Sequence, residues 1–222
     1  MSGLRLFHTT YVQLVLTNYS TNLRRDQKML ITEALIFKWY SEDQNRLLPF
    51  NSIKGEGKTP EEIVVEKIFT TNTTVRLLLH REIFTEKELR LISCDLAELS
   101  MPIWREACPA DDRPDMCLKT ARLYACGLCS RLEFVKASMA GWKAALLEYQ
   151  RSVLNLGVVA TPEEFAVRAA VATTDDDAER AARLSSLNSI RATSFESNIA
   201  QGWLAQLEIV KAALFSRDEG DS

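Results

Sequence analysis

The chain has 222 residues, of which 46% are apolar and 26% charged, and its net charge is −3. This balance excludes a disordered chain, and no apolar run approaches the roughly 20 residues that a membrane-spanning helix requires. Only eight glycines and six prolines are present, too few for a many-stranded β fold, which needs turn residues every ~8–12 positions. We therefore expect an all-α protein with two parts, a helical subdomain and a long helical hairpin.

The first part is expected to span residues 1–110. Over residues 20–40 apolar side chains recur at intervals of three and four, which predicts a helix with a wide apolar face. Residues 41–59 are polar and contain Gly55 and Gly57, so they are expected to form a loop.

Capping residues mark two helix starts in this part. Thr59 can accept a backbone N–H as an N-cap and Pro60 suits a first helical turn, so a helix is expected to begin there. Thr85 and Glu88 have the spacing of a capping box, which predicts a second start. Between these helices, residues 73–82 fit a helix or a strand equally well, because a short apolar run does not distinguish the two.

The second part, residues 111–222, contains the strongest pattern in the sequence. From Leu118 to Leu156 every a and d position of a heptad repeat is apolar, as in a coiled coil or a long bundle helix. We expect one unbroken helix over residues 115–156, roughly 63 Å long at about 1.5 Å per residue. The larger residues of its seam are Leu118, Leu128, Leu132, Val135, Met139, Trp142, Leu146, Tyr149, Val153 and Leu156.

A second long helix is expected to pair with the first. Helix-start residues predict a short helix over residues 162–172 and a long one over 175–216, with a kink in the Ser-rich stretch 185–198. The similar lengths favour an antiparallel hairpin, with the aspartates at 175–177 beside the basic end of the first helix near Arg151. The seam residues of this second helix are Trp203, Leu207 and Leu214.

The cysteines are the nearest approach to a chemical motif. Cys126 and Cys129 form a C-x-x-C pair, but the heptad register places it in the middle of a helix, whereas a redox pair lies at a helix N-terminus. Cys108 and Cys117 would complete a set of four zinc ligands, yet the second C-x-x-C of a zinc ribbon is missing. We interpret the thiols as structural and expect neither a metal nor a cofactor.

Two further patterns fall short of a catalytic site. Residues 52–59 approximate a phosphate-binding loop, but Ser52 stands where the motif requires its first glycine. The two histidines, His8 and His80, supply no oriented general base for a Ser-His-Asp arrangement. We assign no catalytic residue and do not expect an enzyme.

The sequence thus predicts a non-enzymatic scaffold, adaptor or assembly subunit whose seam binds a second copy or a helical partner. The alternative is a helical nucleic-acid-binding protein of the nucleoprotein or RNA-sequestering type, because residues 1–58 carry a charge of +3, with 8 basic against 5 acidic residues. Its expected contacts are Arg24, Arg25, Arg122, Lys136 and Lys143. The expected location is cytoplasmic, given free cysteines without a secretory signal, although the acid-poor amphipathic start also fits an organelle transit peptide.

Overall fold

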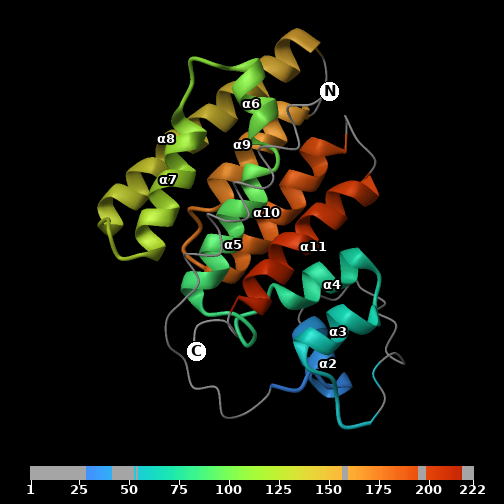
Figure 1. The fold of residues 1–222 in the computed structure, drawn as a ribbon. Helices are drawn as coiled ribbons and strands as arrows, with labels where there is room; N and C mark the ends of the chain where they lie inside the picture. Colours follow the sequence, from blue (N-terminus) through green and yellow to red (C-terminus); the bar gives the residue numbers. More distant parts are fainter. Residues whose placement is uncertain (1–28, 42–52, 54, 157–159, 195–198, 217–222) are drawn as a thin grey trace. The chain divides into compact units, whose positions relative to one another are not determined.

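The computed structural model describes residues 29–41, 53, 55–156, 160–194 and 199–216. These residues form ten α-helices joined by turns, and the one strand-like pairing among them is an isolated antiparallel bridge between Ile31 and Lys58 (Figure 1). The predicted all-α fold class is confirmed.

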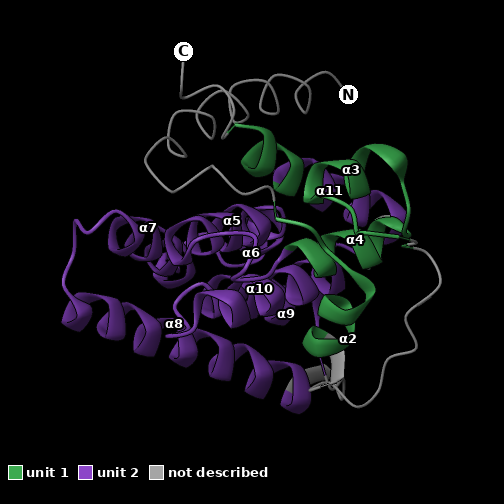
Figure 2. Cartoon of the chain, turned by 90° about the horizontal axis from the view of Figure 1, so that it is seen from below, with its two compact units in different colours: residues 1–78, 210–222 green, residues 79–209 purple. Residues whose placement is uncertain are grey.

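The helices fall into two compact units (Figure 2). Unit 1 comprises residues 1–78 and 210–222, and unit 2 comprises residues 79–209. Unit 1 contains α2 (Glu33–Ser41), α3 (Pro60–Glu66) and α4 (Thr71–Leu78). Unit 2 contains α5 (Glu86–Glu98), α6 (Met101–Ala107), α7 (Arg113–Ala125), α8 (Arg131–Arg151), α9 (Pro162–Ala172) and α10 (Ala178–Thr193). The last helix, α11 (Ile199–Phe215), begins in unit 2 and ends in unit 1, and the expected boundary at residues 110/111 falls inside unit 2.

Side-chain caps fix the starts of the predicted helices. The Thr59 and Thr85 hydroxyls each accept the backbone N–H three residues on, and the backbone N–H of each threonine donates to the carboxylate of that third residue, a glutamate, so both form capping boxes. Thr161 caps α9, and Asp177 caps α10 by accepting two backbone N–H groups. Of the segment 73–82, which fits a helix or a strand from sequence alone, residues up to Leu78 are helical, because α4 ends there.

Unit 1 contains one departure from the predicted helix over residues 20–40. The described part of that stretch becomes helical only at Glu33, because Ile31 exchanges backbone hydrogen bonds with Lys58 at 2.7 and 3.1 Å. Gly57 permits this close approach: its φ is +107°, and a Cβ there would lie 3.1 Å from the Ile31 carbonyl oxygen. The start of the predicted helix, and most of the loop predicted after it, lie outside the described residues.

The prediction of one unbroken helix over residues 115–156 is wrong. The chain turns after α7, where Gly127 adopts a left-handed conformation with φ +70°. The Gly127 N–H donates to the Tyr124 carbonyl at 3.0 Å, and the next N–H, of Leu128, donates to the Leu123 carbonyl at 2.8 Å. These two bonds are the Schellman arrangement, which commonly ends a helix at a glycine.

A new helix begins immediately after this turn. The Ser130 hydroxyl accepts the Glu133 N–H at 3.3 Å, and the Glu133 carboxylate accepts the Ser130 N–H at 2.7 Å. The resulting capping box starts α8. α8 therefore packs beside α7 as the second arm of a short helical hairpin (Figure 1), and residues Ser152–Leu156 extend it as a π-helix.

The predicted long helix over residues 175–216 is also divided. α10 ends at Thr193 and α11 begins at Ile199, so the division falls in the Ser-rich stretch where the sequence predicts a kink. α10 packs against α5 and α9, and Asp176 pairs with Arg131 at the start of α8, at 3.0 Å, rather than with its basic end. The long antiparallel hairpin is therefore not formed.

A buried arginine joins the central helices of unit 2. Arg90 of α5 is 1% exposed, and its side chain lies over the ring of Phe134, 5.0 Å from the ring centroid. The guanidinium donates at 2.7 to 3.2 Å to three backbone carbonyls of the turn between α9 and α10, those of Thr173, Asp175 and Asp176. Because carbonyls at a helix end lack intrahelical partners, this cation both closes α9 and fixes the start of α10.

Candidate functional site

α8 lies at the outer edge of unit 2, with one face against α7 and α9 (Figure 2). Small residues make this inward face fit closely. A Cβ built on Gly141 would collide with the Sγ of Cys117 and lie 2.7 Å from a methyl carbon of Val171. Beside it, the ring of Phe134 stacks on Tyr124 with centroids 4.3 Å apart. The inward face is therefore filled, and the opposite face is covered by no described helix.

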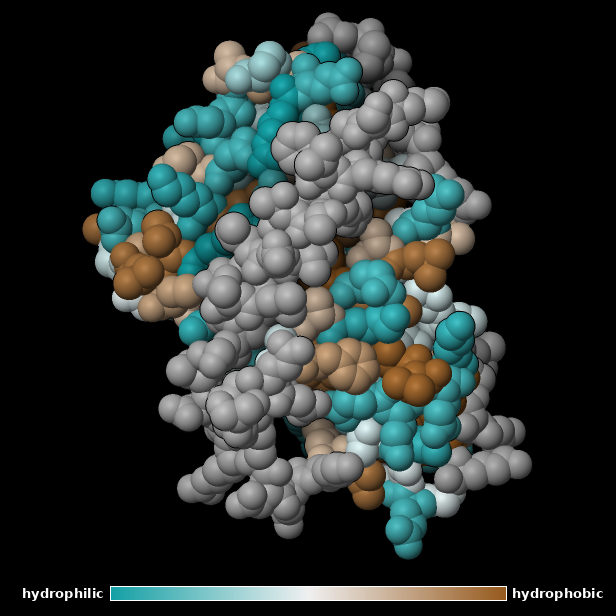
Figure 3. Space-filling view, viewed as in Figure 1, coloured by the Kyte–Doolittle hydropathy of each residue, from teal (hydrophilic) through white to brown (hydrophobic). Residues whose placement is uncertain are grey.

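Large apolar side chains occupy that opposite face. We define the α8 patch as Leu128, Leu132, Val135, Met139, Trp142, Leu146, Leu147, Tyr149, Val153 and Leu154. Their exposed fractions range from 37% to 81%, and in Figure 3 apolar side chains are visible near the turn between α7 and α8. Apart from Leu128, in the turn before the helix, they follow one another at helical spacing along α8 and its extension, so the patch is continuous.

The size of the α8 patch sets it apart from ordinary surface. With roughly 200 Å² for a fully exposed large side chain, ten such residues at about half exposure present on the order of 1,000 Å². The largest apolar patch on a typical monomer is about 300–600 Å². A helix that is apolar on both faces is normally buried on both. We conclude that α8 carries a second apolar stripe, beyond its packed inward face, in an exposed position.

Two lysines lie among the apolar residues of this face. Lys136 and Lys143 are exposed, and neither forms an ion pair with any described residue. Arg131, at the start of the helix, is by contrast engaged with Asp176.

The carboxylates of α8 balance these lysines only in part, through the electrostatic attraction between Lys136 and Glu133. Glu133 is directed to its own helix start, where the backbone N–H and hydroxyl of Ser130 lower the pKa of its carboxyl group. Glu148 faces inward and is 5% exposed; burial raises the pKa of its carboxyl group, and Arg151 at 3.5 Å partly opposes that effect. The outward face of α8 is therefore apolar and positively charged.

The other predicted seam residues are not part of this surface. Leu118 on α7 and Leu214 on α11 are buried, and Trp203 and Leu207 are half-buried. The side chain of Leu156 lies outside the described part of the chain. Of the predicted seam, the exposed continuous portion is the one on α8.

The sequence prediction missed two members of the patch, Leu147 and Leu154, which are 55% and 81% exposed. Both occupy b positions, which a heptad pattern assigns to solvent. The small residues Gly141, Ala144 and Ala145 were the available signal, because they mark the face that approaches neighbouring helices and so place most of the larger side chains on the other side.

The predicted nucleic-acid contacts are dispersed. Arg24 and Arg25 lie outside the described residues. Arg122 forms ion pairs with two carboxylates of α5, at 3.0 and 3.6 Å. Lys136 and Lys143 lie within the α8 patch, where apolar side chains surround them.

The cysteines occupy separate environments. Cys117 is buried between α7 and α8, where its thiol donates to the Ala137 carbonyl at 3.2 Å and burial raises its pKa to about 12. The C-x-x-C pair lies in the turn between α7 and α8 rather than in mid-helix, and Cys126 is exposed there. Burial and Glu133 raise the pKa of the Cys129 thiol, the opposite of what a redox pair requires. Among the described residues, no three His, Cys, Asp or Glu side chains are placed to share a metal ion.

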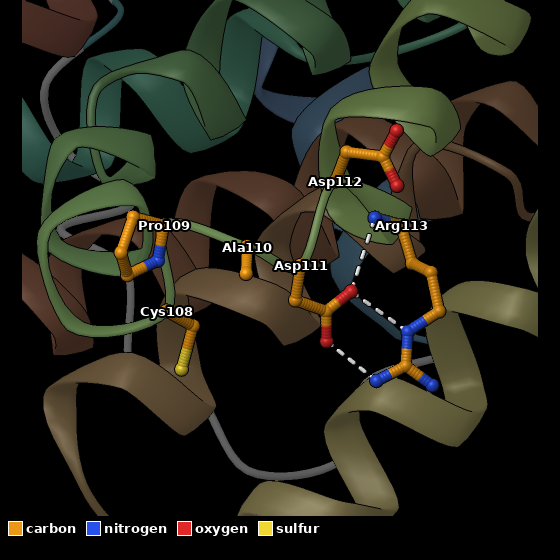
Figure 4. Close-up of a pocket in the computed structure, with 6 residues that line it drawn as sticks. All are labelled: Cys108, Pro109, Ala110, Asp111, Asp112 and Arg113. Atoms are coloured by element: carbon orange, nitrogen blue, oxygen red, sulfur yellow. Dashed lines mark hydrogen bonds and ion pairs between the residues drawn. The ribbon is translucent and has the colours of Figure 1, made fainter.

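An open groove of about 540 Å³ borders the turn between α6 and α7, lined by residues 108–113 (Figure 4). The one arginine that Figure 4 shows there is paired within the groove, since Arg113 donates to the Asp111 carboxylate at 2.7 Å. Burial raises the pKa of the Cys108 thiol at its edge. The groove therefore offers neither an activated nucleophile nor an unpaired arginine.

Comparison of the chain with known protein families, with characterised proteins and with solved structures gives no match. None of the helices in the described residues is both long and apolar enough to span a lipid bilayer.

Proposed function

We propose that the protein is a non-enzymatic assembly subunit, a scaffold or an adaptor, which binds another protein helix through the α8 patch. The observation that carries this proposal is the continuous exposed apolar face of α8 beside an inward face that is already packed. A face of this kind costs solubility in a monomer and has no role in holding its own unit together.

The energetics favour association. Removing on the order of 1,000 Å² of apolar surface from water contributes about 25 kcal/mol before costs, at roughly 25 cal/mol per Å². Association costs an estimated ~4–15 kcal/mol, with about 0.5–1.5 kcal/mol more for each side chain that is immobilised. For the ten side chains of the patch these costs come to roughly 9–30 kcal/mol, the same order as the apolar term. A complementary partner buries apolar surface of its own as well, and that second contribution provides the surplus that holds the complex together.

The shape of the patch favours a helix as the partner. The patch runs the length of α8, whose 21 residues correspond to roughly 32 Å at about 1.5 Å per residue. Its side chains form ridges at intervals of three and four residues, and such ridges fit the grooves of a second helix. Trp142 is 58% exposed, and a large aromatic side chain in the middle of an exposed apolar face is typical of an interface anchor.

The test is the native mass of the protein in an extract of cells that produce it, by size-exclusion chromatography. The test variant carries Leu132→Glu, Met139→Glu and Leu146→Glu, at positions that are 55% to 64% exposed. We expect the wild type to elute well above its chain mass of 25.1 kDa and the variant to elute as a monomer, because three buried carboxylates are incompatible with an apolar interface.

A matched control separates loss of the interface from a general effect of added charge. It carries Phe37→Glu, Val65→Glu and Leu204→Glu, at positions that are 52% to 70% exposed but lie outside the α8 patch, and it should elute like the wild type. A wild type that elutes as a 25.1 kDa monomer both in the extract and after purification would contradict the proposed function.

A further inference from the structure

We infer that the partner of the α8 patch is a second copy of this chain, with the two α8 helices packed antiparallel about a two-fold axis. This inference rests on the proposed function and names its partner. It is argued from the area of the patch, the register of its side chains and the charges within it.

The area of the patch matches what a stable dimer needs. Each copy presents on the order of 1,000 Å² of apolar surface, compared with roughly 800 Å² for each partner in a standard-size interface. A two-fold axis lets one surface cover itself, since each contact is then made twice by the same residues. A second copy therefore covers the whole patch without requiring any other protein.

The antiparallel register is specified by the positions of the large residues. A two-fold axis between Ala140 and Gly141 in sequence places Met139 of one copy beside Trp142 of the other. The same axis places Val135 opposite Leu146 and Leu132 opposite Tyr149. Every layer along the helix then pairs a larger side chain with a smaller one, which fills space evenly.

A parallel pairing is less favourable for two reasons. In a parallel dimer Trp142 would meet Trp142 of the second copy in one layer, and Val135 would meet Val135 in another. Layers of two large side chains would then alternate with layers of two small ones. A parallel dimer would also align the two helix dipoles, whereas antiparallel helices bring opposite ends together.

The charges give the dimer a characteristic salt dependence. In the antiparallel register Lys136 of one copy lies near Lys143 of the other, on both sides of the axis. Like charges at this spacing oppose association weakly, and salt screens them. We therefore expect the dissociation constant to decrease about two- to five-fold between low and high salt, the reverse of a complex held by ion pairs.

Disulfide cross-linking of the purified full chain tests the register. In a background with the exposed Cys126 replaced by Ser, the variant with Val135→Cys and Leu146→Cys should form a covalent dimer on mild oxidation. The variant with Val135→Cys alone should not, because the two copies of that position would be about 16 Å apart along the axis, well beyond the ~7 Å that a disulfide can span. Val65→Cys, also exposed, is the matched control outside the patch.

The outcomes separate this inference from the proposed function. Cross-linking of the double variant alone, together with a purified wild type at twice 25.1 kDa, supports the antiparallel dimer. Cross-linking of Val135→Cys alone, or a dimer in which the double variant does not cross-link, overturns the register. A purified wild type that is monomeric, but whose larger mass in the extract is lost in the α8 triple-glutamate variant, overturns the second copy as partner and leaves the proposed function standing. A monomer in both preparations overturns both.

Discussion

A substitution at Gly127 distinguishes the turn between α7 and α8 from a continuous helix, because the two structures predict changes of opposite sign in the free energy of unfolding. Gly127 has φ +70°, and a Cβ added there would meet no atom within 4 Å. Gly127→Ala therefore introduces no steric clash with the rest of the molecule, and its cost is the left-handed backbone conformation of an L-residue, roughly 1–2 kcal/mol. Subtracting about 0.4–1 kcal/mol for the restricted unfolded chain leaves a net loss of about 1 kcal/mol in the free energy of unfolding.

A continuous helix through the same position would give the opposite result. A glycine in the middle of a helix is less stable than alanine by roughly 0.5–1 kcal/mol, so Gly127→Ala would then stabilise the protein. Thermal unfolding followed by circular dichroism distinguishes the two, since about 1 kcal/mol corresponds to a shift of roughly 2–4 °C in Tm for a chain of this size.

Gly127→Asn provides the control, because asparagine tolerates the left-handed conformation better than alanine. We expect Gly127→Asn to lie between the wild type and Gly127→Ala. If Gly127→Ala proves as stable as the wild type or more stable, the Schellman turn is wrong, and with it the hairpin that turns the α8 patch outward.

Three further predictions concern the interior of unit 2. Arg90→Met should lower the free energy of unfolding by about 3–5 kcal/mol, because one buried and two partly buried backbone carbonyls lose a charged donor. A loss below about 1 kcal/mol in urea denaturation would mean that other groups satisfy them. Glu148→Gln should raise Tm at pH 7, because burial raises the pKa of the Glu148 carboxyl group in the folded protein. The native state then binds protons more tightly than the unfolded chain, so the stability of the wild type falls as pH rises through the titration. The difference in Tm between variant and wild type should vanish below about pH 4, where the carboxyl group is protonated in both states. Gly141→Ala should destabilise by about 1–3 kcal/mol through overpacking against Cys117, and an added Cys117→Ala should recover part of that loss in a double-mutant cycle.

Local signals in the sequence were sufficient to place helix starts. Thr59 and Thr85 are predicted as caps and the start of the helix over 162–172 is predicted from its first residues, because a cap depends on residues within one turn of the helix and little on tertiary structure. The same kind of signal was present at Gly127 and at Ser130 with its glutamate three residues on. The heptad pattern outweighed it, because α7 and α8 each carry an apolar stripe and the turn happens to keep them in phase.

The direction of the α8 patch was not available from periodicity. On α7 the seam residue Leu118 is buried, whereas on α8 Met139 of the same a row is 59% exposed. A heptad pattern states which residues share a face and does not state what that face meets. The opposite face determines which side of α8 packs inward, because Gly141 and the alanines near it permit a closer approach to α7 and α9 than leucine or tryptophan would.

The inward face of α8 packs against unit 2 and the outward face does not, which explains why an exposed apolar face is compatible with a stable unit. The contacts that hold α8 in place are made by its small residues and by Phe134, and they are complete without the α8 patch. The large residues therefore contribute little to folding. Replacing them by polar residues would be expected to improve the solubility of an isolated subunit. Their continuous arrangement over about six turns of helix is what the proposed interface would require, because the same side chains would leave water if a second α8 bound there.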